Sequence, residues 1–338
     1  MRYFVLVQFC FCSLLGFAHN ITLTDSINKS PISFATVYDV NGNLIGRSDV
    51  DGNIDLIKGQ EYHVSHIGYE RKKIICDDNS IVYLIPISYI MPEVSVTTKM
   101  KKYFHCKVFF RSVEHVDSVL KYYMDGVREF VIDTKTKKVK LRNEKTYYYM
   151  SKRKDIAQKK RNFMISDRYI SLPYFERNSM YEETLNDKCK RIEGGIVYGD
   201  TAQIGRCEIV NEKNEMILSL DALYPKSNLV GNLFGYTQVL SKHDQTEIYR
   251  YNDLGSPTIF DIKSSNSYRH FTLTHKKENF IRDIDVEDVF YVVESEYTDE
   301  KKISTSETLQ EDYKKYSAKF PLNSIIQEQL VAEQQLQQ

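Results

Sequence analysis

The sequence lacks tryptophan altogether and has no excess of charge of either sign. Its 46 Lys and Arg residues are balanced by 46 Asp and Glu residues. A general nucleic-acid binder usually carries a basic excess, because its cations displace the counterions of the phosphates. The neutral balance therefore argues against nucleic acid as a partner. With 42% hydrophobic residues and no net charge, the composition is that of a folded protein and not of a disordered one.

Long hydrophobic runs are also missing, except at the N-terminus. There, residues 3–15 form an uncharged apolar run that follows Arg2 and precedes Gly16 and Ala18, two small residues at the positions that a signal peptidase reads. We therefore expect a signal peptide at residues 1–18 and an exported protein, in the periplasm or associated with the outer membrane. No later stretch approaches the roughly 20 apolar residues of a membrane-spanning helix, so no transmembrane span is expected after cleavage.

Cysteine is scarce, with 6 residues, of which two lie in the expected signal peptide. Cys76, Cys106, Cys189 and Cys207 remain, and an oxidising compartment permits disulfides between them. Cys189 and Cys207 flank a predicted hairpin and are the best-placed pair. The alternative is a set of buried free thiols.

What the sequence has in abundance is aromatic residues, with 25 Tyr and 17 Phe, which favour strands. Within residues 21–98, turn-forming residues interrupt short apolar runs at regular intervals. Asn41-Gly42 predicts a type I′ hairpin turn, in which both central residues need positive φ. Short strands at this spacing predict an all-β sandwich. The expected strands are 33–40, 44–47, 54–57, 62–67, 71–76 and 81–87.

Three ordered motifs in this segment resemble those of carboxypeptidase-regulatory-like domains, which are transthyretin-type β-sandwiches. Residues 31–37 (PISFATV) resemble the opening strand, residues 48–54 (SDVDGNI) resemble the T-D-x-x-G-x-F turn, and residues 64–70 (VSHIGYE) resemble the S-x-I-G-Y strand. Residues 84–96 are similar to the segment that follows such domains in Bacteroidetes envelope proteins. The resemblance implies a non-catalytic sandwich.

The rest of the chain predicts a larger β-rich α+β domain of unknown function at residues 99–303, followed by a helical tail at residues 304–338. Helices are expected at 305–315 and 323–336, and a loop or short helix at 112–121. The expected strands are 108–111, 122–133, 139–142, 194–209, 215–223, 236–251, 258–262, 268–275 and 288–297. The fold class is therefore mainly β, a sandwich followed by a β-rich domain with C-terminal helices.

The sequence assigns no catalytic, cofactor-binding or metal-binding residue. His63 and His66 are three apart, so on a strand they face opposite sides and do not share a metal. The acidic stretch from Asp49 to Asp55 lacks the glycine and glutamate positions of a calcium loop, and predicts a turn in which side chains bond the backbone. Neither a Gly-x-Ser-x-Gly motif nor a Gly-rich phosphate loop is present.

Two charged clusters have a structural and a functional interpretation. The acidic cluster of Asp283, Asp285, Glu287 and Asp288 predicts a solvated loop edge, with a cation site as the alternative. The basic run at residues 152–161 predicts a solvated face, with contact to anionic lipid or polysaccharide as the alternative. Three tripeptides resemble the O-glycosylation sequon of Bacteroidetes envelopes and place sugar on Ser26, Ser118 and Thr201.

These observations favour a non-enzymatic cell-envelope protein. The sandwich would act as a spacer or docking module, and the β-rich domain would bind an envelope protein, glycan or lipid. An envelope hydrolase that acts on peptide or glycan is the first alternative. A carrier of a hydrophobic ligand, such as lipid or lipoprotein, is the second, because Tyr- and Phe-rich strands precede terminal helices that could cover a ligand.

Overall fold

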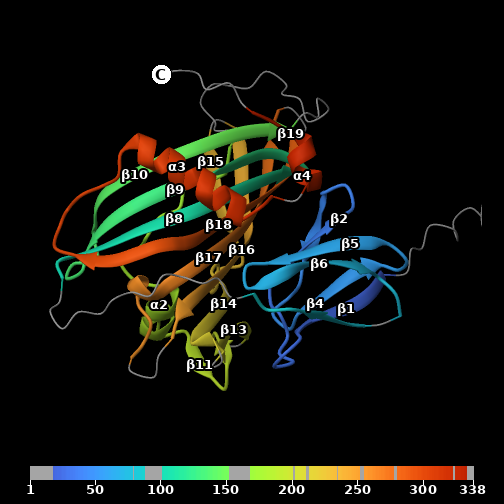
Figure 1. Cartoon of the computed structure of the whole chain (residues 1–338). Coiled ribbons are helices and arrows are strands. Elements are labelled where there is room, and N and C mark those ends of the chain that lie inside the picture. Colours follow the sequence, from blue (N-terminus) through green and yellow to red (C-terminus); the bar gives the residue numbers. More distant parts are fainter. Residues whose placement is uncertain are drawn as a thin grey trace, which may run out of the picture. The chain divides into compact units, whose positions relative to one another are not determined.

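The computed structural model describes residues 18–78, 80–87, 101–151, 168–200, 202–210, 213–233, 235–251, 255–277, 280–322 and 324–332. They form two compact units (Figure 1). The first holds the described residues up to Pro86 except Asn41–Leu44, and the second holds Asn41–Leu44 and the described residues from Ile87 onward. Residues 1–17 of the expected signal peptide 1–18, the expected end of the first domain near Thr98, and the basic run 152–161 lie outside the described residues.

The first unit is a sandwich of two sheets. One sheet has the order β4-β1-β7 and the other has the order β3-β2-β5-β6. The strands are β1 (Ala18–Asp25), β2 (Thr36–Asp39), β3 (Leu44–Arg47), β4 (Asn53–Ile57), β5 (Glu61–His66), β6 (Tyr69–Ile75) and β7 (Ile81–Leu84). The six predicted strands are all present, and β1 is an additional strand that the turn pattern did not predict.

The core of the sandwich consists of side chains that alternate along both sheets. Ile21 and Leu56 from one sheet and Val37, Tyr62 and Val64 from the other are nearly inaccessible to solvent and belong to one cluster. In β4 and β5 every second residue is buried, as the two-residue period of a strand requires when one face meets a core. The predicted β-sandwich is confirmed.

The turn after Ser48 confirms the interpretation of its acidic residues as turn formers. The Oδ1 atom of Asp49 accepts hydrogen bonds from the backbone N–H of Asp51 at 2.9 Å and of Asn53 at 2.8 Å. The type I′ assignment at Asn41-Gly42 is wrong, because Gly42 has a φ of 78° but Asn41 is not among the residues with positive φ.

The second unit is built on a 12-stranded sheet in which every described pairing is antiparallel. Its order is β11-β12-β13-β14-β16-β17-β18-β8-β9-β10-β19, and β15 pairs with β16. The long central strands are β8 (Tyr103–Val116), β9 (Val119–Asp133), β10 (Val139–Ser151), β16 (Tyr236–Arg250), β17 (Ile262–His275) and β18 (Phe280–Thr298). The shorter ones are β11 (Arg191–Glu193), β12 (Ile196–Tyr198), β13 (Gln203–Val210), β14 (Glu215–Asp221), β15 (Leu229–Leu233) and β19 (Leu330–Ala332).

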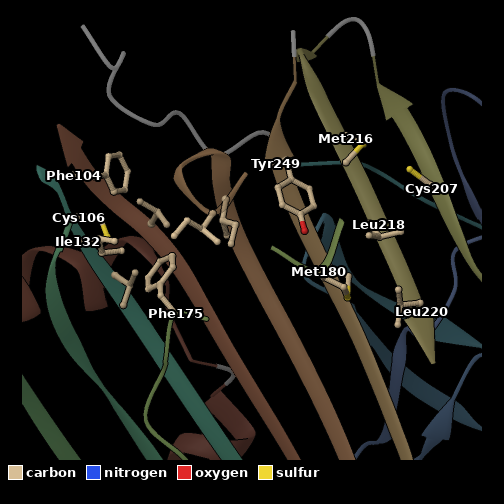
Figure 2. Packing of buried hydrophobic residues seen from close by; sticks show 14 of the residues in the cluster. Phe104, Cys106, Ile132, Phe175, Met180, Cys207, Met216, Leu218, Leu220 and Tyr249 are labelled. Atoms are coloured by element: carbon tan, nitrogen blue, oxygen red, sulfur yellow. The ribbon is translucent and has the colours of Figure 1, made fainter. Parts of the chain in front are cut away.

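One face of this sheet is covered by a segment that we call the strap, residues 168–178, and by helix α2 (Met180–Asn186). This strap face carries the largest apolar cluster, in which Phe175 of the strap and Met180 of α2 pack with Cys106, Phe130 and other strand residues (Figure 2). The 3₁₀ helix η3 (Ile259–Asp261) adds Ile259 to the same cluster.

The opposite face is covered by α3 (Ser306–Lys319), and we call it the α3 face (Figure 1). Leu309 and Tyr316 of α3 pack against Phe109 and Val127. Phe320, which ends the helix, stacks on Phe109 at 5.3 Å between ring centroids. Because other segments pack on both faces of β9, every residue from Leu120 to Ile132 is buried.

The structure corrects three expectations about this unit. Residues 112–121 are not a loop or helix: β8 continues to Val116, and Asp117 and Ser118, both with positive φ, turn the chain directly into β9. In the described part of the expected helix 323–336, residues Ser324–Gln329 are helical (α4), and β19 then pairs with β10. The predicted strand 258–262 is mainly η3.

Glycine at position 52 is required by two independent constraints, so we predict that Gly52→Ala destabilises the first unit. Its φ is 78°, and an added Cβ would lie 2.6 Å from the carbonyl oxygen of Leu23. A non-glycine residue in the left-handed region costs about 1–3 kcal/mol, and the contact adds to this. Urea denaturation measures the loss.

Gly59→Ala is the matched control, because Gly59 has a φ of 80° but nothing within 4 Å of an added Cβ. We expect a smaller loss of unfolding free energy in this variant. Equal losses in the two variants would contradict a role for the close approach to Leu23.

Candidate ligand-binding site

Polar side chains form two rows across the strap face of the large sheet. The pairing registers place Gln245, Ser267, Asp288 and Ser112 side by side in one row. The next row holds His243, Arg269, Val286 and Glu114. A polar band on an otherwise apolar face is where catalytic or ligand-binding groups would be sought first.

Asp288 belongs to this band, although its acidic cluster was expected at a solvated loop edge. That expectation is wrong: Asp283, Asp285, Glu287 and Asp288 all lie within β18. Asp288 accepts hydrogen bonds from Ser112, from Arg269 and from Ser171 Oγ at 2.8 Å. Its carboxylate therefore ties the strap to the sheet.

The other acidic residues of the cluster do not converge on a cation. Asp285, which lies on the opposite face, accepts hydrogen bonds from Tyr268 at 2.5 Å and from His270 at 2.7 Å, and Glu287 accepts one from Asn266 at 2.8 Å. Among the described residues, no group of three His, Cys, Asp or Glu side chains could hold a metal ion.

Glu247 is a buried carboxyl of the strap face with a raised pKa. Burial raises its pKa to about 7, although hydrogen bonds from Tyr249 Oη and the Met180 backbone N–H act in the opposite direction. The Tyr249 hydroxyl in turn accepts a hydrogen bond from the Tyr181 N–H at 3.1 Å. Glu247 and Tyr249 therefore hold the first turn of α2 against the sheet, and their polar atoms are engaged with the protein itself.

A cavity of about 370 Å³ opens elsewhere, where the β9–β10 hairpin meets the strap. Its lining is strongly basic, although the whole chain is neutral. The cationic residues that line it are Lys137, Lys138, Lys140, Arg142 and Arg177. Its aromatic residues are Tyr174 and Phe175.

The hairpin wall of the cavity is set by local sequence. Asp133 Oδ1 accepts hydrogen bonds from the N–H of Thr136 at 2.8 Å and from its hydroxyl at 2.9 Å, which closes the turn. The pairing of β9 and β10 then shifts register between Val139 and Leu141. This β-bulge inserts Lys140 as an extra residue, and such irregularities re-aim side chains at the ends of strands.

The strap wall is set by packing over a long sequence distance. The Phe175 ring meets Phe130 edge-on at 5.0 Å and Phe290 at 5.4 Å between centroids. Arg128 Nη1 donates to the carbonyl oxygen of Pro173 at 2.8 Å, which attaches the strap to β9 two residues before Phe175. With Phe175 only 4% exposed, the neighbouring Tyr174 is left 59% exposed at the cavity.

Few of the cations are neutralised. Lys137 pairs with Glu182 of α2, and the Lys140 ammonium lies 3.9 Å from Asp133. Within the described part of the chain, no carboxylate lies at ion-pair distance from Lys138, Arg142 or Arg177. A concave surface lined by charges of one sign attracts ligands of the opposite sign.

Within the described residues, none of the candidate site residues predicted from the sequence lines this cavity. Cys189 is exposed and Cys207 is buried, and the expected pairing is not formed in the structure, where both are free thiols along with Cys76 and Cys106. Burial raises the pKa of Cys207 to about 12. Among the expected glycosylation sites, Ser26 is half-buried and Ser118 is exposed at the β8–β9 turn, while Thr201 lies outside the described residues.

Comparisons with known proteins give no family. No family model matches the chain, and no curated protein matches it. Among solved structures, one described as lipid–protein interactions in lipovitellin matches with 10% identity and a TM-score of 0.26. The match covers 62% of this chain and 27% of that one, so this chain spans about a quarter of its length. A similarity this low carries no argument about fold or function.

The buried Glu247 gives a pH-dependent prediction. Its pKa is about 7 in the folded state against 4.5 for an ordinary glutamate, so the folded protein binds the proton more tightly. The stability that Glu247 contributes should therefore be fully present below the ordinary pKa and be lost as the pH rises toward 7, by up to about 1.4 kcal/mol per pH unit.

Glu247→Gln removes this titration, because glutamine stays neutral at every pH. Urea denaturation at several pH values should show the stability of wild type falling relative to that of the variant between pH 4.5 and 7. Parallel stability curves for the two proteins would contradict the assignment of a buried, protonated Glu247.

Proposed function

We propose that the protein is a non-enzymatic protein of the cell envelope whose larger unit binds an anionic ligand. The cavity between the β9–β10 hairpin and the strap is the observation that carries this proposal. Five cationic side chains line it and no acidic residue does. Small-molecule sites in proteins usually occupy about 300–1,000 Å³, and the volume of this cavity falls in that range.

The first unit supports the envelope part of the proposal. Its motifs resemble those of carboxypeptidase-regulatory-like domains, and the apolar run before Ala18 has the pattern of a signal peptide. In this proposal the sandwich is a spacer or docking module of that family and the protein is exported to the periplasm or the outer membrane. None of the described helices is long and apolar enough to cross a membrane.

Neither alternative has an observation that favours it. A hydrophobic ligand on the strap face would have to displace Phe175, Met180 and Ile259, which pack into the apolar cluster there. A glycan hydrolase usually needs a pair of carboxylates that can reach substrate. Glu247 and Asp288, two carboxylates of the strap face, instead accept hydrogen bonds from the protein's own donors.

The double variant Lys138→Glu with Arg142→Glu tests the anion site. We expect wild type to bind tripolyphosphate in calorimetric titrations at low salt and the variant to bind at least about tenfold more weakly, since each exposed ion pair contributes up to about 1 kcal/mol and charge reversal adds repulsion. Added salt should weaken wild-type binding, because these side chains are exposed and screened.

The control variant is Lys276→Glu with Lys277→Glu, which changes two exposed lysines of the turn between β17 and β18 by the same total charge. This variant should keep wild-type affinity. Equal weakening in the two double variants, or no binding by wild type, would contradict an anion site at this cavity.

A further inference from the structure

The aromatic wall of the cavity points to a more specific ligand. We infer that the anionic ligand is a saccharide that carries carboxylate or phosphate groups, with a sugar ring lying on Tyr174. This inference rests on the proposed function, because it assigns a chemical class to the ligand of the same cavity. Two observations support this inference. Tyr174 is exposed at the cavity, and the lining residues come from two separate walls, the hairpin and the strap.

Tyr174 is the most exposed aromatic side chain among the described residues, with 59% of its surface accessible. The anchoring of the strap is performed by its neighbour Phe175, which packs with Phe130 and Phe290. No ring or cation of the described residues lies in stacking contact with Tyr174. The ring therefore lines the cavity without contributing to the core behind it.

The exposed face of an aromatic ring at a polar cavity favours one kind of ligand surface. The face of the ring carries negative electrostatic potential, so it favours the weakly positive C–H groups on one side of a sugar ring. The ring also removes apolar surface from water without requiring a hydrogen-bonding partner. A small inorganic anion offers no such surface, and Tyr174 would then have no role.

The cations select against a neutral sugar. Lys137, Lys138, Lys140 and Arg142 come from the hairpin wall, whereas Tyr174 and Arg177 come from the strap wall. A ligand that fills the cavity therefore meets four hairpin cations on one side, and an aromatic ring and Arg177 on the other. The planar guanidinium groups of Arg142 and Arg177 can each bind a carboxylate or phosphate group through two hydrogen bonds. A sugar ring with acidic substituents presents both surfaces at once.

The test uses the full mature chain with three probes: a galacturonic acid oligomer, a neutral galactose oligomer of the same length, and tripolyphosphate. We expect the acidic oligomer to bind and the neutral one to bind much more weakly or not at all. Tyr174→Ala should weaken the acidic oligomer about tenfold, through loss of the ring surface, and leave tripolyphosphate binding unchanged. Tyr174→Phe should retain binding, because it keeps the ring.

Tyr83→Ala is the control, since Tyr83 is also an exposed tyrosine, 42% accessible, but belongs to the first unit. It should bind all probes as wild type does, and thermal melts should show all variants folded. If tripolyphosphate binds but Tyr174→Ala leaves the acidic oligomer unaffected, or the neutral oligomer binds equally well, the saccharide inference fails alone. If no probe binds to wild type, the proposed function fails with it.

Discussion

The packing of Phe175 between Phe130 and Phe290 is the interaction on which the candidate site depends. Burying a phenylalanine contributes about 1.5–3 kcal/mol, and here it secures the strap to the sheet. Phe175 is buried, while its neighbour Tyr174 is left exposed at the cavity. With the hydrogen bond from Arg128 to Pro173, this contact brings Arg177 to a hairpin that is distant in sequence, and so places the two walls of the cavity together.

A sheet that is covered on both faces is normally apolar inside, but the sheet behind the strap contains buried charged side chains. These side chains form hydrogen bonds or ion pairs with other residues of the protein. On the α3 face, Glu129 accepts hydrogen bonds from His105 at 2.5 Å and from the N–H of Ser304 at 2.6 Å. Burial acts to raise the pKa of Glu129, but these bonds outweigh it and the pKa is lowered. The hydrogen bond to Glu129 also raises the pKa of His105. These bonds fix the chain just before α3, whose Tyr313 donates to Asp125 at 3.0 Å.

Local patterns predicted much of the fold. The sandwich strands other than β1 and the Asp49 turn depend on neighbouring residues, and these were predicted correctly. Residues 112–121 were not, because Ser112 and Glu114 look like surface residues until their partners are known. Those partners, Asp288 for Ser112 and the Tyr169 N–H for Glu114, lie far along the chain.

The candidate site was not predictable for the same reason. The alternation from Val139 to Arg142 correctly indicated a strand with a basic face, but nothing local connects that face with Tyr174. The packing of Phe175 and the hydrogen bond from Arg128 to Pro173 bring the two segments together. Likewise, the acidic residues of β18 resemble a solvated cluster because they are close together in the sequence, whereas pairing with β17 and β8 gives Asp285, Glu287 and Asp288 separate partners.

Lysine footprinting of the full chain tests the central claim most directly, because it locates the ligand without any substitution. The chain is acetylated briefly with and without the galacturonic acid oligomer, and the modification of each lysine is measured by mass spectrometry. A ligand in the cavity should protect Lys138 and Lys140, which line it, and leave Lys276 and Lys277 as reactive as before. Uniform protection of exposed lysines, or protection that spares Lys138 and Lys140, would contradict a ligand site between the hairpin and the strap.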